Sequence, residues 1–166
     1  IYNSYYPSPI GLLKIKFTNS TVKRIEFADD ENISNDYQTF YLYDKQAKDI
    51  FNMIYDQFNE YFTGQRKKFD LPINLNGTSF QNDVWRELQR IPFGNVKSYG
   101  EIACNIGRNG AARAVGATKH KNPLAIVIPC HRVIGKNGNL TGYAGGITRK
   151  KWLLNHEEKY CAQCVK

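Results

Sequence analysis

The chain has 166 residues, a length that suits one domain of ordinary size or two small ones. Apolar residues make up 42% of it and aromatic residues 13%, so it can build a packed core, and disorder throughout is excluded. The net charge of +8 lies in the second half: residues 1–77 hold 9 Lys and Arg against 10 Asp and Glu, whereas residues 78–166 hold 14 against 5. Either the second half binds a polyanion or its basic surface is idle, and charge alone does not decide between these two.

Hydropathy and cysteine content exclude further classes. No apolar run approaches the roughly 20 residues that span a bilayer, and residues 1–11 lack the basic-then-apolar order of a secretory signal. All four cysteines lie at or after Cys104, so no disulfide can join the two halves, which favours a reducing compartment. The pair Cys161 and Cys164 has no second pair with which to complete a zinc site. We expect a cytoplasmic protein, associated with the nucleoid if it is prokaryotic, without metal or membrane attachment.

The first half reads as a small α/β unit. Apolar and polar residues alternate over residues 11–18 and 22–29, which predicts a β-hairpin. Residues 29–36 are polar and predict a loop, and the apolar residues of 44–62 recur at helical spacing. Residues 67–75 are candidates for a return to the sheet. This half contains no histidine and no phosphate-binding loop, so we expect no chemistry in it.

A turn at residues 76–78 marks the predicted domain boundary, and a helix follows it. Thr78 and Gln81 fit a capping box, in which the Thr78 side chain accepts from the Gln81 N–H and the Gln81 side chain accepts from the Thr78 N–H. The apolar positions after this cap share one helical face, which predicts a buried stripe. These positions are Phe80, Val84, Leu88 and Ile91.

Two short helices with a glycine-containing turn are predicted next. Ser98 and Glu101 suggest a second capping box, residues 107–110 read "GRNG", and residues 111–121 form the second helix. This arrangement is the helix-turn-helix pattern, which is weak by itself and stronger in a basic domain. The second helix carries mostly small residues, which allow either close packing against another helix or close approach to a bulky partner. The small residues are Ala111, Ala112, Ala114, Gly116 and Ala117.

A cysteine, a histidine and an arginine follow a short apolar run. Residues 126–128 predict a buried strand, which Pro129 ends because proline cannot continue a central ladder. Cys130 would then stand where the strand leaves the core. A lone cysteine is most often inert core filling, but the adjacent His131 and Arg132 favour a reactive thiol.

Several motifs in one order and spacing give the chain a family resemblance. "IPCHRV" contains Cys130, "RAVG" begins 17 residues earlier at Arg113, "SYGEIA" precedes both, and "GYAGG" and "KKWLLNHE" follow. Over residues 78–160 the chain resembles the O6-alkylguanine-DNA alkyltransferases. The resemblance implies a ribonuclease-H-like α/β domain at residues 1–77 and a mostly helical, winged-helix-like domain with a helix-turn-helix at residues 78–166.

The resemblance also implies a mechanism. Cys130 would accept the alkyl group, His131 would act through a water as its base, and Glu157 would orient His131. Asn122 would brace the turn before the predicted strand at residues 126–128. Tyr99 would help rotate the nucleotide out of the duplex and would donate a proton to the leaving guanine.

The resemblance further implies contacts with duplex DNA that contains O6-alkylguanine. Arg113 would enter from the minor groove and fill the space that the flipped base leaves. The remaining implied contacts are those of Ala111, Ala112 and Gly116 with DNA, and those of Tyr143, Ala144, Val133 and Lys150 with the base. Each molecule would act once, because the product thioether has no easy route back. It would act as a monomer and without a cofactor.

The sequence departs from part of the family at two places. The first half lacks the Cys and His with which some members bind zinc, and Ala125 stands where some members have proline. Two other classes remain. A cysteine hydrolase would also use Cys130 and His131 but would leave Arg113 and the basic half unexplained. A DNA-binding sensor without chemistry would not need Cys130.

Overall fold

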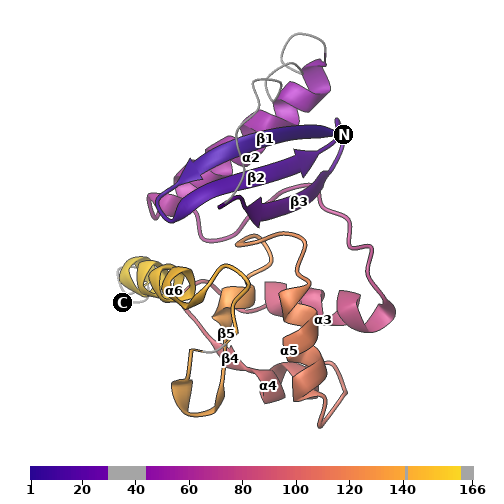
Figure 1. Cartoon of the computed structure of the whole chain (residues 1–166), viewed down its shortest axis with the longest axis vertical. Coiled ribbons are helices and arrows are strands. Elements are labelled where there is room, and N and C mark those ends of the chain that lie inside the picture. The colour runs from indigo at the N-terminus through magenta and orange to yellow at the C-terminus, as the bar shows by residue number, and fades with distance from the viewer. Residues whose placement is uncertain (30–43, 141, 162–166) are drawn as a thin grey trace. The chain divides into compact units, whose positions relative to one another are not determined.

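The computed structural model describes residues 1–29, 44–140 and 142–161, and the chain divides into two compact units (Figure 1). The first unit comprises Ile1–Asn74 and Pro123–Ala125, and the second comprises Leu75–Asn122 and Ile126–Lys166. The predicted loop at residues 29–36 lies, apart from Asp29, outside the described residues. Within the described ranges, no helix is both long enough and apolar enough to cross a membrane.

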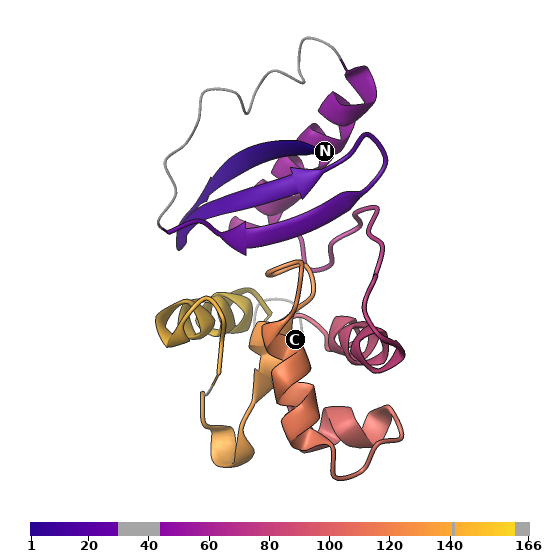
Figure 2. The same ribbon diagram turned by 45° about the vertical axis from the view of Figure 1, so that its right-hand side comes forward.

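The first unit is an antiparallel sheet with one helix on it. Strands β1 (Tyr2–Ser8), β2 (Gly11–Phe17) and β3 (Val22–Phe27) follow one another in the order β1-β2-β3, and helix α2 (Lys45–Phe62) packs on the sheet (Figure 2). The predicted hairpin and helix are therefore confirmed. Sequence reasoning missed β1 because its inward-facing positions are Ser4 and Tyr6 rather than aliphatic residues.

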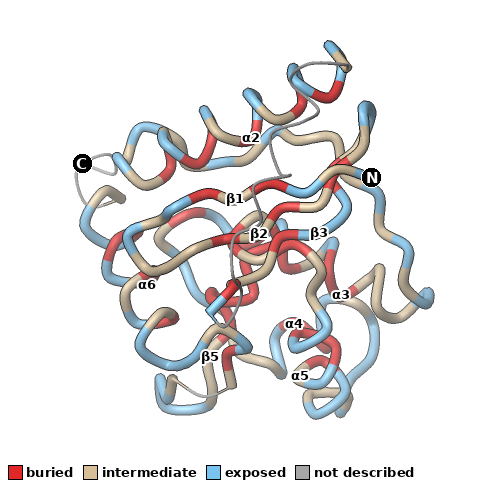
Figure 3. The backbone as a smooth tube through the Cα atoms, turned by 45° about the horizontal axis from the view of Figure 1, so that its top comes forward, coloured by how far each residue is buried: buried red, intermediate tan, exposed pale blue. Residues whose placement is uncertain are grey.

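Apolar side chains of α2 face the sheet. Asp44 caps the helix by accepting a hydrogen bond from the Ala47 N–H at 3.0 Å. Figure 3 shows buried residues recurring along α2, and among them Phe58 stacks on Tyr6 with ring centroids 5.4 Å apart. The Tyr6 hydroxyl donates to Asn59 Oδ1 at 2.6 Å, so the polar end of this buried ring is satisfied.

The segment that leaves α2 touches the sheet at one point only. Within residues 67–75, the isolated bridge to the sheet is the one between Ile73 and Val22, so the predicted return to the sheet is a single bridge and not a strand. Pro72 has no N–H with which to extend a ladder, although its carbonyl accepts the Val22 N–H at 2.8 Å. The Gln57 amide holds this segment on α2 through two hydrogen bonds with the backbone of Asp70, at 2.8 and 2.9 Å.

The second unit contains the predicted helices. They are α3 (Ser79–Gln89), α4 (Tyr99–Asn105), α5 (Ala112–His120) and α6 (Ile147–Cys161). Helices α4 and α5 pack together across the predicted turn, in which Gly107 and Gly110 have φ of 75° and 85° (Figure 2).

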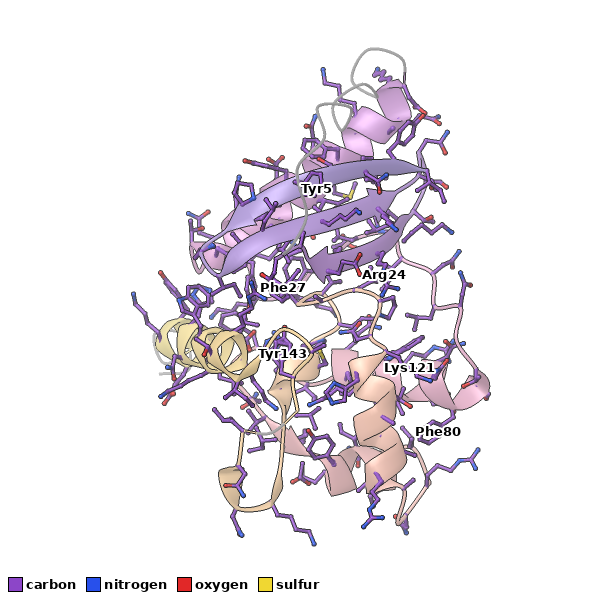
Figure 4. The ribbon with its side chains drawn as sticks, in the orientation of Figure 1. Tyr5, Arg24, Phe27, Phe80, Lys121 and Tyr143 are labelled. Carbon is purple, nitrogen blue, oxygen red and sulfur yellow. The ribbon has the colours of Figure 1, made fainter. Side chains whose placement is uncertain are left out.

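Short strands and caps complete this unit. Strand β4 (Lys97–Ser98) pairs in parallel with β5 (Val133–Ile134). The Thr78 capping box forms as predicted. In the second predicted box, the Glu101 N–H donates to Ser98 Oγ at 3.1 Å, and this is the half of the box that the structure describes. On α3, Trp85 is buried, and its indole donates to the Thr118 carbonyl near the end of α5. Phe80, which was expected in the buried stripe, is only half-buried (Figure 4).

The predicted strand at residues 126–128 is wrong. These residues form a turn in which Ile126 has φ of 71°, and Cys130–Arg132 then form the 3-10 helix η2. The extended pairing comes earlier, where Leu124 makes a parallel bridge to Ile25 of β3. A short apolar run indicates burial but cannot by itself distinguish a strand from a packed turn.

The capping box predicts the stability effect of one hydroxyl. Thr78→Ala should lower the free energy of unfolding by about 1 kcal/mol, because the Gln81 N–H loses its partner. Urea denaturation measures this change. The neighbouring exposed Ser79→Ala should change the free energy by less than about 0.5 kcal/mol, and equal effects of the two substitutions would contradict the role of the cap.

Candidate active site

The thiol of Cys130 lies at the start of η2 and is 4% exposed. One side chain fixes the turn that leads to it: Asn122 Nδ2 donates to the Ile128 carbonyl at 2.8 Å and to Cys130 Sγ at 3.2 Å. Asn122 directly follows the C-cap residue of α5, so its amide ties the end of this helix to the Cys130 sulfur. The structure thus brings two of the predicted site residues into contact.

The two residues after Cys130 bind one carboxylate on α6. His131 Nε2 lies 2.7 Å from Glu157 Oε2, and Arg132 donates to both oxygens of Glu157 at 2.8 and 3.0 Å. Arg132 also donates to the Ile91 carbonyl at 2.7 Å, and the backbone N–H of Gly94 donates to Glu157 at 3.3 Å. A carboxylate that accepts this many hydrogen bonds fixes the orientation of each donor.

The charges in this network set the proton on His131. Burial alone would raise the pKa of Glu157, but His131 and Arg132 hold that pKa well below its usual range. Burial lowers the pKa of His131 even though Glu157 opposes the change, so the imidazole is neutral near pH 7. With Glu157 ionised, we assign the imidazole proton to Nε2, which leaves Nδ1 as the basic nitrogen.

The surroundings of Cys130 shift the pKa of its thiol in opposite directions. Burial raises the pKa of Cys130, while the Asn122 hydrogen bond and the positive charges of Lys119 and Lys150 lower it. The net shift is upward, so the resting state is a protonated thiol. Attack by this sulfur therefore requires a base to remove its proton.

Two lysines near the thiol are almost fully buried. Lys150, on α6, donates to the Val133 carbonyl at 2.5 Å, and burial, followed by the charge of Lys119, lowers its pKa to about 8. Lys119, on α5, donates to Tyr99 Oη at 2.8 Å and to the Gly142 carbonyl. Val133 and Lys150 were both expected to contact the base; in this structure Lys150 holds the backbone that carries Val133.

Tyr143 and Ala144 precede α6, and Figure 4 labels the first of them. Tyr143 is buried, and desolvation raises its pKa well above the usual value, whereas Ala144 is exposed. Over the described ranges, the Tyr143 hydroxyl and His131 Nδ1 are buried polar atoms without a hydrogen-bond partner. Such atoms are costly unless a ligand or water serves them, so they point to a binding or reaction site.

The residues expected to contact DNA lie on α5 and around it. Arg113 is exposed, and Ala111 and Ala112 are half-buried. Gly116 faces the Tyr99 ring, where a Cβ atom would lie 3.5 Å from the ring edge. A Cβ atom there would make ordinary van der Waals contact, so the Tyr99 ring leaves room for a small side chain at this position.

Sequence reasoning missed the roles of Arg132 and Lys119. Charged residues are usually exposed, and neither position carried a motif that says otherwise. One signal was present for Lys119: it follows the buried Val115 by four residues and so shares its helical face. For Arg132 the signal was its place directly after the Cys–His pair, within "IPCHRV".

No cluster of His, Cys, Asp and Glu that could hold a metal ion occurs in the described part of the chain. Cys161 is a free thiol there, and Cys164, the other cysteine of "CAQC", lies outside the described residues.

Family models match both parts of the chain. Residues 1–75 match the ribonuclease-like domain of 6-O-methylguanine DNA methyltransferase, and residues 79–159 match its DNA binding domain. The methylated-DNA–protein-cysteine methyltransferase of Mycobacterium bovis is 46% identical over 151 residues, which is 91% of this chain and 88% of the relative. That of Shigella flexneri is 56% identical over 103 residues, 61% of this chain and 60% of the relative.

A solved structure agrees with these matches. The Mycobacterium tuberculosis OGT in complex with DNA superimposes with a TM-score of 0.83 at 40% sequence identity. The superposition covers 96% of this chain and 94% of that one. The expected two-domain architecture, a small sheet domain followed by a helical domain, is confirmed by this likeness.

The buried carboxylate predicts how stability responds to acid. Glu157 has a lower pKa in the folded protein than its unfolded value of about 4.3, so it stabilises the fold above that pH and the contribution is lost as the pH falls below it. Glu157→Gln lacks this titration. Its free energy of unfolding, although lower than the wild type's near pH 7, should therefore fall less between about pH 6 and about pH 3.

Urea denaturation at a series of pH values measures how steeply the free energy of unfolding falls with pH, which is the slope compared between wild type and variant. The exposed neighbour Glu158→Gln is the control and should keep the wild-type slope. If Glu157→Gln kept that slope as well, the carboxylate would not carry the acid sensitivity.

Proposed function

The chain belongs to the methylated-DNA–protein-cysteine methyltransferase family, which repairs alkylated DNA by transferring the alkyl group to a cysteine of the protein, and we propose that this cysteine is Cys130. One observation carries the proposal. Cys130 Sγ, the amide of Asn122 and the His131–Glu157 pair form one buried site, and the neighbouring lysines add positive charge to it.

The transfer requires little beyond these groups. The carbon on O6 of an alkylated guanine is a soft electrophile and suits a sulfur nucleophile. His131 Nδ1 takes the thiol proton, through a water, and Glu157 stabilises the imidazolium that forms. The sulfur–carbon bond then forms while the carbon–oxygen bond breaks, and the electron pair stays on the guanine.

The leaving guanine needs a proton, and Tyr99 supplies it from its hydroxyl. Tyr99 begins α4, while Gly116 of α5 faces its ring and Lys119 of the same helix binds its oxygen, so two helices position the hydroxyl. Tyr143 and Ala144 lie over the base, and Val133 lines the pocket. The buried hydroxyl of Tyr143 would then find its partner in the bound base. The reaction uses no cofactor, and each molecule acts once.

The substrate is duplex DNA, in keeping with the family and with the basic second half. We assign DNA contact and chemistry to residues 78–166 and none to residues 1–77. Helix α5 approaches the minor groove, with Ala111 and Ala112 near the backbone, and Arg113 fills the stack after the alkylguanine is flipped out. We expect a monomer that acts in the cytoplasm.

Cys130→Ala should abolish transfer and leave DNA binding near the wild-type level, because the variant lacks the sulfur but keeps the basic surface. Mass spectrometry after incubation with a methylguanine-containing duplex should find one methyl group on Cys130 of the wild type. Cys104→Ala, which removes an exposed thiol, is the control and should still be methylated at Cys130. Label on Cys104 or Cys161, or repeated turnover, would refute the assignment.

Arg113→Ala should slow transfer from duplex DNA by about 10- to 100-fold, the scale of one good contact at the level of a base. Transfer from a free alkylguanine base needs no flipping, so its rate should hardly change. Single-turnover kinetics on both substrates measure this. Arg90→Ala removes an equal charge from the exposed end of α3 and should spare both rates at saturating DNA. Equal losses on the two substrates would make Arg113 a residue of the fold or the pocket.

A further inference from the structure

Lys119 is a buried cation without a carboxylate partner. It is 1% exposed, and among the described residues no Asp or Glu lies within salt-bridge distance of its Nζ. Burying an ammonium group is costly unless it makes strong hydrogen bonds, so a lysine at this position needs a reason. Its hydrogen-bond acceptors are the hydroxyl of Tyr99 and the carbonyl of Gly142, and the Lys150 side chain is its close neighbour.

The chemistry of an ammonium group fixes the direction of one of these bonds. Lys119 can only donate, so Tyr99 Oη is the acceptor at 2.8 Å, and the hydroxyl hydrogen points away from Lys119. A hydroxyl that accepts a hydrogen bond from a cation also becomes a stronger donor. The second bond, to Gly142, holds the backbone next to Tyr143. Lys119 therefore acts on both aromatic residues that the proposed mechanism places at the base.

Lys150 explains how two buried lysines can be neighbours. Burial and the charge of Lys119 lower the pKa of Lys150 to about 8, so Lys150 gives up its proton readily. Lys150 thus holds its proton less firmly than an ordinary lysine, which eases the repulsion between the two side chains, and the ammonium of Lys119 stays beside Tyr99.

We propose that Lys119 is a positioning residue for alkyl transfer: its ammonium directs the Tyr99 hydroxyl hydrogen toward the leaving guanine and stabilises the phenolate that forms. This role rests on the proposed function. The balance is complete: the sulfur–carbon bond forms, the carbon–oxygen bond breaks, the Tyr99 proton goes to the guanine, and the phenolate charge faces the Lys119 ammonium at hydrogen-bond distance. No further reactant is needed.

A double-mutant cycle on the full chain tests this role. Lys119→Met should slow single-turnover transfer from a methylated duplex by about 10- to 100-fold, the range for a hydrogen bond to a charged group. In the Tyr99→Phe background, which lacks the hydroxyl, the same substitution should slow transfer by less than about threefold. Lys121→Met, which removes an equal charge at the exposed end of α5, should change the rate by less than about twofold at saturating DNA (Figure 4).

Iodoacetamide separates an effect on Tyr99 from an effect on the thiol. It alkylates Cys130 without a leaving guanine, so Lys119→Met should slow this reaction far less than alkyl transfer. Thermal unfolding of Lys119→Met should stay within a few degrees of wild type or rise, because methionine fills similar space without a buried charge. Should Lys119→Met fail to fold, Lys119→Gln, which keeps an N–H donor without the charge, takes its place in the same cycle.

Three outcomes would overturn the role of Lys119: no slowing in the wild-type background, the full loss persisting in Tyr99→Phe, or an equal loss with iodoacetamide. Transfer by the wild-type protein onto Cys130 is measured in the same series. If the wild type transfers and the cycle is additive, only the role of Lys119 falls. If the wild type does not transfer, the proposed function falls, and the role of Lys119 falls with it.

Discussion

The ionised carboxylate of Glu157 is the contact on which the rest of the site depends. It is fully buried, and it binds the imidazole of His131, the guanidinium of Arg132 and the backbone N–H of Gly94. Through Arg132 it also reaches the Ile91 carbonyl, so α6, η2 and the segment after α3 meet at one charge. Removing a single partner from such a network leaves the others charged and unsatisfied, which is why buried ion pairs are strongly destabilised by single substitutions.

The same contact links stability to reactivity. A buried imidazole would be free to rotate or to change tautomer if Glu157 did not fix it. With Glu157 in place, its basic nitrogen is Nδ1, and burial keeps that nitrogen neutral. For the neighbouring Cys130, burial also favours the uncharged form, which for a thiol is the protonated one. The proposed mechanism thus pairs a protonated thiol with a neutral imidazole that can accept its proton, and the positive charges of two lysines favour the thiolate that forms.

Sequence reasoning succeeded where local patterns determine the structure. The Thr78 capping box, the helical spacing of residues 44–62 and the alternation of the β2–β3 hairpin are all set by neighbours in sequence. It failed at residues 126–128, because three buried apolar residues look alike in a strand and in a turn pinned by a distant amide such as that of Asn122. It also missed the first strand, whose inward side chains are polar or aromatic.

Within the candidate site, sequence reasoning failed to assign the buried charged residues. Cys130, His131, Glu157 and Asn122 could be named from motifs, and the structure brings them together. Lys119 and Arg132 could not be assigned, because burial of a cation depends on partners elsewhere in the fold, here Tyr99 on α4 and Glu157 on α6. Such partners become visible only once the tertiary structure is known.

The order in which the site is built has a consequence for a newly made protein. Glu157 and Lys150 are on α6, which the ribosome makes after every other element of the site. While domains fold during synthesis, Cys130 is already present, but its base is not yet oriented and one of the two nearby lysines is missing. In the proposed mechanism, the thiol of the nascent chain therefore has no oriented base until α6 docks.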